Sequence, residues 1–191
     1  KKKKTWVLHR MDIKIHEYPK WRESITIETW PAAGDALRAY RNYRILNENG
    51  DEIAVCLSYW MMINMKTRRP TRMTQDILNT RLSDREHVLP INSSKIPKIE
   101  EPSSGKIIPV RRSDLDMNKH VNNARYLEWM EEPLNEGQIY RTNKVDIIFL
   151  RESVYGDTIT SQIKAAEQAS TFHQLKNQRD EIIALASFSD I

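Results

Sequence analysis

The 191-residue chain contains one cysteine, Cys56, and only five glycines. A single cysteine can form neither an internal disulfide nor a cysteine-based zinc cluster, so a reducing compartment is expected. Long apolar runs are also missing, because the longest, at 55–63, is interrupted by Ser58 and has the length of a strand. A membrane-spanning helix needs about 20 apolar residues, so we predict no membrane span.

The chain has little excess charge of either sign. Its 30 Lys and Arg residues against 26 Asp and Glu residues leave a net charge of +4, which the four lysines at 1–4 alone can supply. No zinc motif or aromatic-basic pattern is present either, so we predict no nucleic-acid partner. Four histidines are scattered through the chain without metal-ligand spacing: His9, His16, His87 and His173. No metal and no cofactor is therefore predicted.

The sequence repeats a strand-rich pattern. Three pairs of segments align in the same order: 11–15 with 145–149, 21–26 with 155–160 and, at a slightly shorter spacing, 51–54 with 180–183. Each copy alternates apolar and polar residues, as half-buried strands do. Two unrelated amphipathic hairpins would also look alike, but the shared order favours two copies of one unit.

A helix is predicted before the second copy only. Its apolar residues recur every three positions and form one stripe: Val121, Ala124, Leu127 and Met130. Asp116 or Asn118 suits the N-cap, and Pro133 ends the pattern. The corresponding helix of the first copy would precede residue 1. Either the first copy evolved without this helix or the chain is truncated at its N-terminus, and we expect truncation.

The first copy contains a predicted hairpin, whereas the region after it is predicted to be irregular. The turn at 47–50 (NENG) predicts a hairpin that joins strands at 38–46 and 52–64. Residues 66–106 are polar and carry four prolines. We predict an irregular linker there, with one short helix near 74–79.

A polar cluster surrounds one histidine at 113–123 (SDLDMNKHVNN), where a strand should meet the helix. His120 can exchange protons near neutral pH, and Asp116 can fix its tautomer. Asn118 and the N–H groups of a helix start can stabilise an oxyanion. The alternative is that these residues only cap the helix, and their spacing does not decide between the two.

A second candidate lies at the end of the strand expected near 145–150. Glu152 could act as a general base for water, and Ser153 beside it could be a nucleophile. The alternative is a solvated bend.

The cluster at 113–123, followed by YLEW at 126–129, resembles the acyl-acyl-carrier-protein thioesterases of bacteria and plant plastids. Further segments resemble that family in its own order: 5–11, 18–21, 60–64, 66–70 and 151–157. The likeness therefore covers the chain from about residue 5 to its end.

The resemblance implies an α+β fold of tandem hot-dog domains, in each of which an antiparallel sheet wraps a long helix. It implies an incomplete first domain at 1–70, which lacks its opening strand and central helix. A linker at 71–106 and a second domain at 107–191, which carries the catalytic residues, follow.

The resemblance also implies that Asp116, Asn118 and His120 are catalytic, with Glu152 opposite. The family often carries a cysteine after the glutamate; this chain has Ser153 there, which argues against thiolate catalysis. We therefore expect hydrolysis of fatty acyl-acyl carrier protein to a free fatty acid, by water that Glu152 and His120 activate. The alternative is a non-catalytic module that binds acyl chains or the carrier protein.

The resemblance names acyl carrier protein as the partner, an acidic protein that basic side chains would attract. The candidates for contacting it are Arg68, Arg69, Arg111, Arg112 and Lys119, each with ordinary solvated charge as the alternative. Trp6, Trp30 and Met62 are the candidates for contacting the acyl chain. We expect a location in the bacterial cytoplasm or the plastid stroma, and hot-dog pairing allows a homodimer.

Overall fold

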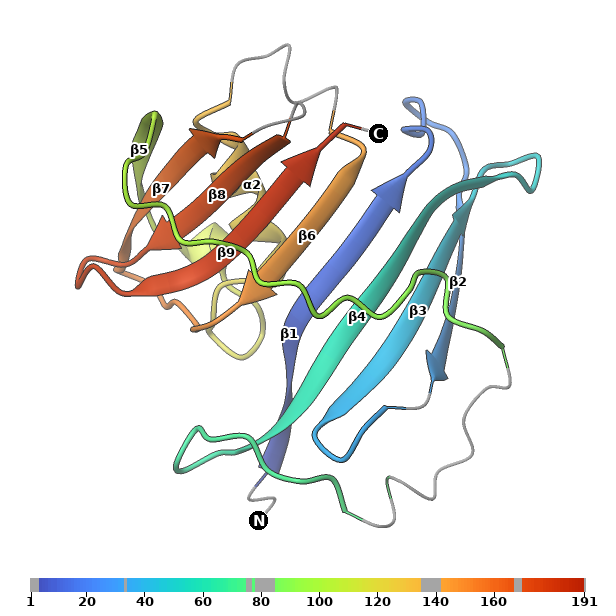
Figure 1. Ribbon diagram of the computed structural model, residues 1–191, viewed down its shortest axis with the longest axis horizontal. Helices are drawn as coiled ribbons and strands as arrows, with labels where there is room; N and C mark the ends of the chain where they lie inside the picture. Colours follow the sequence, from blue (N-terminus) through green and yellow to red (C-terminus); the bar gives the residue numbers. More distant parts are fainter. Residues whose placement is uncertain are drawn as a thin grey trace. The chain divides into compact units, whose positions relative to one another are not determined.

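The computed structural model describes residues 4–32, 34–74, 77, 85–134, 142–166 and 170–190. The chain forms two compact units, Lys1–Ser93 and Ser94–Ile191. Both are built on an antiparallel sheet (Figure 1). Within the described ranges, no helix is long and apolar enough to cross a membrane.

The sheet of the first unit has the strand order β2-β3-β4-β1 (Figure 1). Its strands are β1 (Lys4–Ile15), β2 (Thr26–Ala32), β3 (Arg38–Leu46) and β4 (Glu52–Asn64). The predicted hairpin joins β3 to β4: Asn47 accepts hydrogen bonds from the N–H groups of Asn49 (3.0 Å) and Asp51 (2.9 Å). Gly50 has a φ of 87°, which glycine adopts without strain.

The sheet of the second unit has the order β5-β7-β8-β9-β6, and helix α2 packs against β7 and β8. The elements are β5 (Ser104–Pro109), the 3₁₀ turn η1 (Arg112–Asp114), α2 (Asn123–Glu131), β6 (Lys144–Phe149), β7 (Thr158–Ala165), β8 (Ser170–Lys176) and β9 (Ile182–Ser189). The helix and sheet together bury a core that includes Ile147, Ile159 and Leu175.

The predicted repeat is confirmed by the strand order, because β2-β3-β4-β1 corresponds to β7-β8-β9-β6. The hairpin turns match as well. Asn177 accepts hydrogen bonds from the N–H groups of Arg179 (2.9 Å) and Glu181 (3.1 Å), as Asn47 does in the first unit. Both hairpins also carry a register shift next to this turn.

The buried face of α2 differs from the predicted apolar stripe. Its buried side chains are Tyr126, Trp129 and Met130, spaced three and four residues apart as one face of a helix requires. Ala124 is exposed and Leu127 only half-buried, so the stripe was wrong at these two positions. The large aromatic side chains bury more apolar surface than the alanine, and they set the rotation of the helix.

The segment predicted as a linker packs on both sheets. In the first unit, Val88 N–H donates to Asn42 Oδ1 (3.0 Å) and Leu89 packs on the core residues Tyr40 and Tyr59. In the second, the side chain of Gln174 bonds the N–H and the carbonyl of Ile99, both at 3.2 Å.

The compact units divide the chain between Ser93 and Ser94, inside the predicted linker, and β5 begins at Ser104, before the predicted second domain. The division into compact units therefore differs from the predicted domain bounds, which were 1–70, 71–106 and 107–191. The short helix predicted near 74–79 lies mostly outside the described residues.

Cys56 is buried in the middle of β4, as a packing residue should be. Burial raises the pKa of its thiol to about 12, and the nearby carboxylate of Asp12 adds to the rise. The thiol is therefore unreactive at neutral pH.

His173 on β8 is fully buried, where Nδ1 lies 3.0 Å from the carbonyl oxygen of Met130 and Nε2 lies 2.8 Å from Thr171 Oγ1. A carbonyl can only accept, so Nδ1 carries the proton of a neutral ring. The ring stacks on Phe188 with centroids 4.0 Å apart. Burial lowers the pKa of His173 from 6.5 to about 4.

This shift predicts a loss of stability in mild acid. The unfolded chain binds the proton near pH 6.5 and the fold only near pH 4, so stability is fully present above pH 6.5 and falls as the pH drops toward 4. The expected loss is on the order of 3 kcal/mol. Urea unfolding across this range measures it.

His173→Gln should flatten this pH dependence, whereas His16→Gln, which removes a half-exposed imidazole of the first unit, is the control. An equally steep fall in stability in His173→Gln would contradict the assignment.

Candidate active site

A tight loop in the second unit carries three of the predicted catalytic residues. Leu115 and Val121 pair at its base, and Asp116 N–H donates to the carbonyl oxygen of His120 (2.7 Å). Inside the loop, Asp116 Oδ1 accepts the N–H groups of Asn118 (2.8 Å) and His120 (3.1 Å). One carboxylate thus holds the backbone on both sides of the turn.

The pKa of Asp116 is set by these bonds. Desolvation acts to raise it, but the N–H groups of His120 and Asn118 outweigh that effect and hold the pKa below its usual value. Asp116 is therefore an anion at neutral pH. Its Oδ2 also lies 3.3 Å from Asn118 Nδ2, which uses one of the two amide hydrogens and leaves the other for a substrate oxygen.

The loop is joined to the segment that follows β6. Val121 N–H donates to the carbonyl oxygen of Ser153 (2.9 Å), and His120 pairs with Val154. This pairing brings together residues that lie more than thirty positions apart in the chain.

The pairing places His120 beside Glu152, with Nε2 of the imidazole 3.7 Å from Oε2 of the carboxylate. Their side chains are 39% and 37% exposed, so water reaches both. The separation is slightly longer than a hydrogen bond. The arrangement puts two proton-exchanging groups next to a water-accessible space.

The N-cap of α2 is Asn122, and not Asp116 or Asn118 as predicted. Asn122 Oδ1 accepts the N–H of Ala124 at 3.0 Å. The helix starts later than predicted because Lys119 has a positive φ of 65° and the pairing of Val121 keeps the chain extended up to the cap. Asp116 and Asn118 are thus free of the capping role that was their alternative explanation.

Ser153 lies next to Glu152 but is 1% exposed. The side chain beside its hydroxyl is the phenol of Tyr126, which stays protonated at neutral pH and cannot act as a base. The hydroxyl of Tyr126 approaches Ser153 but donates to the carbonyl oxygen of Arg151 (3.1 Å), and burial raises the pKa of Tyr126. The geometry favours water over Ser153 as the nucleophile.

The predicted acyl-chain residues fall on two faces of the first sheet. Trp6 and Met62 are paired across β1 and β4 and share a face. Trp30 is paired with Asn42 on β3, which in turn is paired with Leu57 on β4. Successive residues of a strand point to opposite faces, and Leu57 and Met62 are five positions apart. Trp30 and Met62 therefore lie on opposite faces of the sheet.

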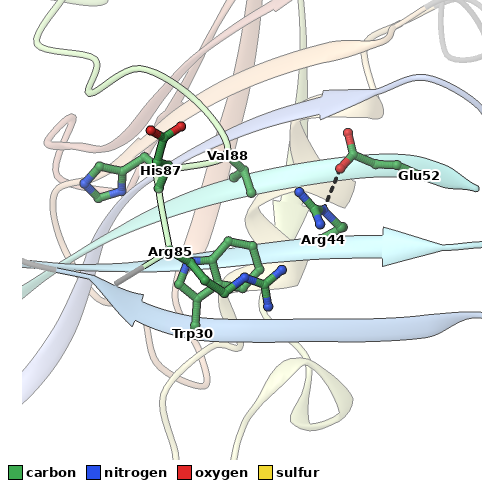
Figure 2. A pocket seen from close by; sticks show the side chains of 7 residues that line it. Trp30, Arg44, Glu52, Arg85, His87 and Val88 are labelled. Atoms are coloured by element: carbon green, nitrogen blue, oxygen red, sulfur yellow. Dashed lines mark ion pairs between the residues drawn. The ribbon is translucent and has the colours of Figure 1, made fainter. Parts of the chain in front are cut away.

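Trp30 lies in a pocket of the first unit that charged side chains surround (Figure 2). The guanidinium of Arg85 stacks 3.6 Å from the centroid of its ring, and Arg44 pairs with Glu52 at 2.7 Å. Arg85 in turn pairs with Glu28 at 2.9 Å. This lining suits a solvated, polar pocket better than an acyl-chain site.

The predicted carrier-binding residues belong to both units. Arg68 and Arg69 lie in the turn after β4, and Arg111, Arg112 and Lys119 lie at the loop of the second unit. All five are exposed. The guanidinium of Arg112 stacks over the ring of Tyr155, 4.4 Å from the ring centroid. Tyr155 follows Glu152 by three positions.

Sequence reasoning missed two residues of the loop's surroundings, Asp114 and Arg125. Asp114 is 1% exposed, and its Oδ1 lies 3.8 Å from Arg125 Nε. The only signal in the sequence is an aspartate two positions before Asp116, which gives no hint of burial. Among the described residues, no group of three or more side chains could hold a metal ion.

Residues 1–80 match the family model of the acyl-ACP thioesterase N-terminal domain, and residues 98–189 match that of the C-terminal domain. The chain belongs to the acyl-ACP thioesterase family. Oleoyl-acyl carrier protein thioesterase 2 of Arabidopsis thaliana, a chloroplastic member, is 34% identical over 179 residues, which are 85% of this chain and 47% of that protein. The chain spans about half the length of the curated relatives it matches.

Solved structures of family members share the fold. An acyl-ACP thioesterase from Bacteroides thetaiotaomicron superimposes with a TM-score of 0.83 at 24% identity, over 98% of this chain and 76% of that one. The 12:0-ACP thioesterase from Umbellularia californica superimposes with a TM-score of 0.87 at 19% identity, over 98% and 75%. The predicted α+β class with tandem hot-dog domains is confirmed.

The positive φ of Lys119 predicts opposite effects of two substitutions. Lys119→Gly should stabilise the protein by up to about 1 kcal/mol, because glycine adopts this conformation freely. Lys119→Val should destabilise it by roughly 1–2 kcal/mol, because a branched side chain clashes there. Urea unfolding distinguishes them.

Lys144→Gly is the control, since Lys144 starts β6 without a positive φ and its glycine variant should be destabilised. A destabilised Lys119→Gly would show that the lysine side chain matters more than the backbone.

Proposed function

We propose that the protein hydrolyses the thioester of fatty acyl-acyl carrier protein and releases a free fatty acid. The observation that carries the proposal is the 3.7 Å approach of His120 to Glu152, beside a loop that also holds Asn118 and Asp116. These groups come from two separate segments and meet at a water-accessible place. Family membership supplies the substrate class, which the names of relatives also carry.

In the proposed mechanism, Glu152 takes a proton from a water molecule with the help of His120. The water oxygen attacks the thioester carbonyl, and a tetrahedral oxyanion forms. The free amide hydrogen of Asn118 stabilises this oxyanion. The carbon–sulfur bond then breaks, the thiolate takes up the proton held by the His120–Glu152 pair, and the fatty acid leaves.

Asp116 orients the reacting groups in this mechanism. Its carboxylate fixes the backbone at Asn118 and His120, so both side chains keep their directions during turnover. Ser153 contributes its carbonyl oxygen to the pairing with Val121, and its hydroxyl has no assigned step.

Acyl carrier protein is the proposed partner. In the second unit, Arg111, Arg112 and Lys119 lie on or beside the loop with Asp116 and His120 and would attract an acidic carrier to the reacting groups. Arg68 and Arg69 remain candidates on the first unit, and Trp6 with Met62 remain the better pair for the acyl chain. The proposed location is where acyl carrier protein occurs, in the bacterial cytoplasm or the plastid stroma.

Removing either member of the proton-exchanging pair should abolish most turnover. Glu152→Gln and His120→Ala should each lower kcat by about 10²–10⁴-fold, the usual contribution of a general base. Release of the carrier thiol from a long-chain acyl-acyl carrier protein measures the rate. Ser153→Ala is the matched test of the adjacent residue and should retain most of the activity.

Near-full turnover in Glu152→Gln would overturn the proposed base. A loss in Ser153→Ala as large as that in Glu152→Gln would instead point to the serine as the nucleophile.

Charge reversal near the loop should weaken carrier binding more than chemistry. Arg112→Glu should raise KM for acyl-acyl carrier protein with little change in kcat, because it acts on the encounter with an acidic surface. The effect should shrink as salt is added. Steady-state kinetics at low and high salt measure it.

An acyl N-acetylcysteamine thioester, which has no carrier protein, is the control substrate and should show no change in KM. An equal rise in KM for both substrates would place Arg112 at the acyl or thiol site.

A further inference from the structure

We infer that Asp114 is a positioning residue that fixes both ends of the loop carrying Asp116, Asn118 and His120. The inference rests on the proposed function, since it concerns the same loop. Asp114 precedes the loop, and its side chain is 1% exposed although a carboxylate is costly to bury. A buried carboxylate requires hydrogen-bond and ion-pair partners, and the partners of Asp114 show which segments it connects.

The partners of Asp114 lie on both sides of the loop. Before the loop, Oδ2 accepts the N–H of Arg111 at 2.7 Å. After it, the backbone carbonyl of Asp114 accepts the N–H of Asn122, the N-cap of α2, at 2.9 Å. One residue therefore ties the entry of the loop to the start of the helix, and Leu115 pairs with Val121 just inside this tie.

The charge of Asp114 is met by two arginines. Arg111 Nε, before the loop, lies 3.7 Å from Oδ2, and the second partner is Arg125, in the first turn of α2. Arg125 Nε lies 3.8 Å from Oδ1, which has no hydrogen-bond partner among the described residues. On its other side, Arg125 is paired with the exposed carboxylate of Glu128. The ion pair between the half-buried Arg125 and the buried Asp114 links α2 to the loop, whereas Glu128 is exposed.

The loop needs this support because its internal hydrogen bonds are exposed. Asp116 and Asn118 are both exposed, so water competes for the bonds that shape the turn. A displacement of about 1 Å at a catalytic group can lower a rate by about 10²-fold. Asp114 therefore acts on catalysis through the position of His120 relative to Glu152, without touching the substrate.

The test compares Asp114→Asn, Arg125→Gln and the double variant with Glu128→Gln. Asp114→Asn keeps an acceptor for the Arg111 N–H but loses the charge that faces the guanidinium groups of Arg111 and Arg125. Each single variant at 114 or 125 should lower kcat by about 10–100-fold with KM nearly unchanged. The double variant, with two neutral amides, should lose less than the product of the two single losses, because Asp114 and Arg125 are in contact. Glu128→Gln, which removes only the exposed partner of the same arginine, should keep the wild-type kcat.

A readout that is independent of activity is hydrogen exchange of the backbone amides at 115–121. Exchange at Asn118 and His120 should become faster in Asp114→Asn and Arg125→Gln, and it should stay unchanged in Glu128→Gln. If Asp114→Asn does not fold, Arg125→Gln and the double variant still decide the matter.

Unchanged loop exchange and unchanged kcat in both single variants would overturn the inference. A loss of activity that only follows the loss of folded protein would also overturn it. If the wild-type protein hydrolyses no acyl thioester, the proposed function fails, whereas loop exchange still shows whether Asp114 holds the loop.

Discussion

The arrangement of the candidate site depends on one hydrogen bond, from Val121 N–H to the carbonyl oxygen of Ser153. It joins a loop that precedes α2 to the segment that follows β6, and it pairs His120 with Val154. Pairing fixes the directions in which the side chains of neighbouring residues leave the backbone. This backbone contact therefore determines how close the imidazole of His120 lies to the carboxylate of Glu152. The side chains need no direct bond to each other, and none shorter than 3.7 Å is formed.

The two units share one sheet design, as the repeat predicts. Both have the same strand order and the same asparagine-centred turn, and in both a side chain of a central strand bonds the backbone of the connecting segment. In the second unit, α2 and the polar loop before it add to this sheet. The sheet therefore supports the loop that carries the candidate residues.

Much of the fold could be predicted from the sequence, because strand alternation and the turn at 47–50 are local signals. The bounds of β3 and β4 were predicted as found. The candidate cluster was predicted from its residue types and from family resemblance. The helix face was partly wrong, since rotation depends on which side chains bury most area. The packing of 85–99 on the sheets and the burial of Asp114 depend on contacts distant in the chain, which no local pattern reveals.

The buried thiol has a practical consequence for spectroscopy. Cys56 is the single cysteine of the chain, and with a pKa of about 12 it stays protonated in neutral buffer. Met117, by contrast, is fully exposed at the tip of the polar loop. A cysteine introduced at position 117 would therefore take a maleimide dye selectively in the native protein, with no need to remove the natural one. Its emission would then report changes in the surroundings of this loop, such as the approach of a carrier protein.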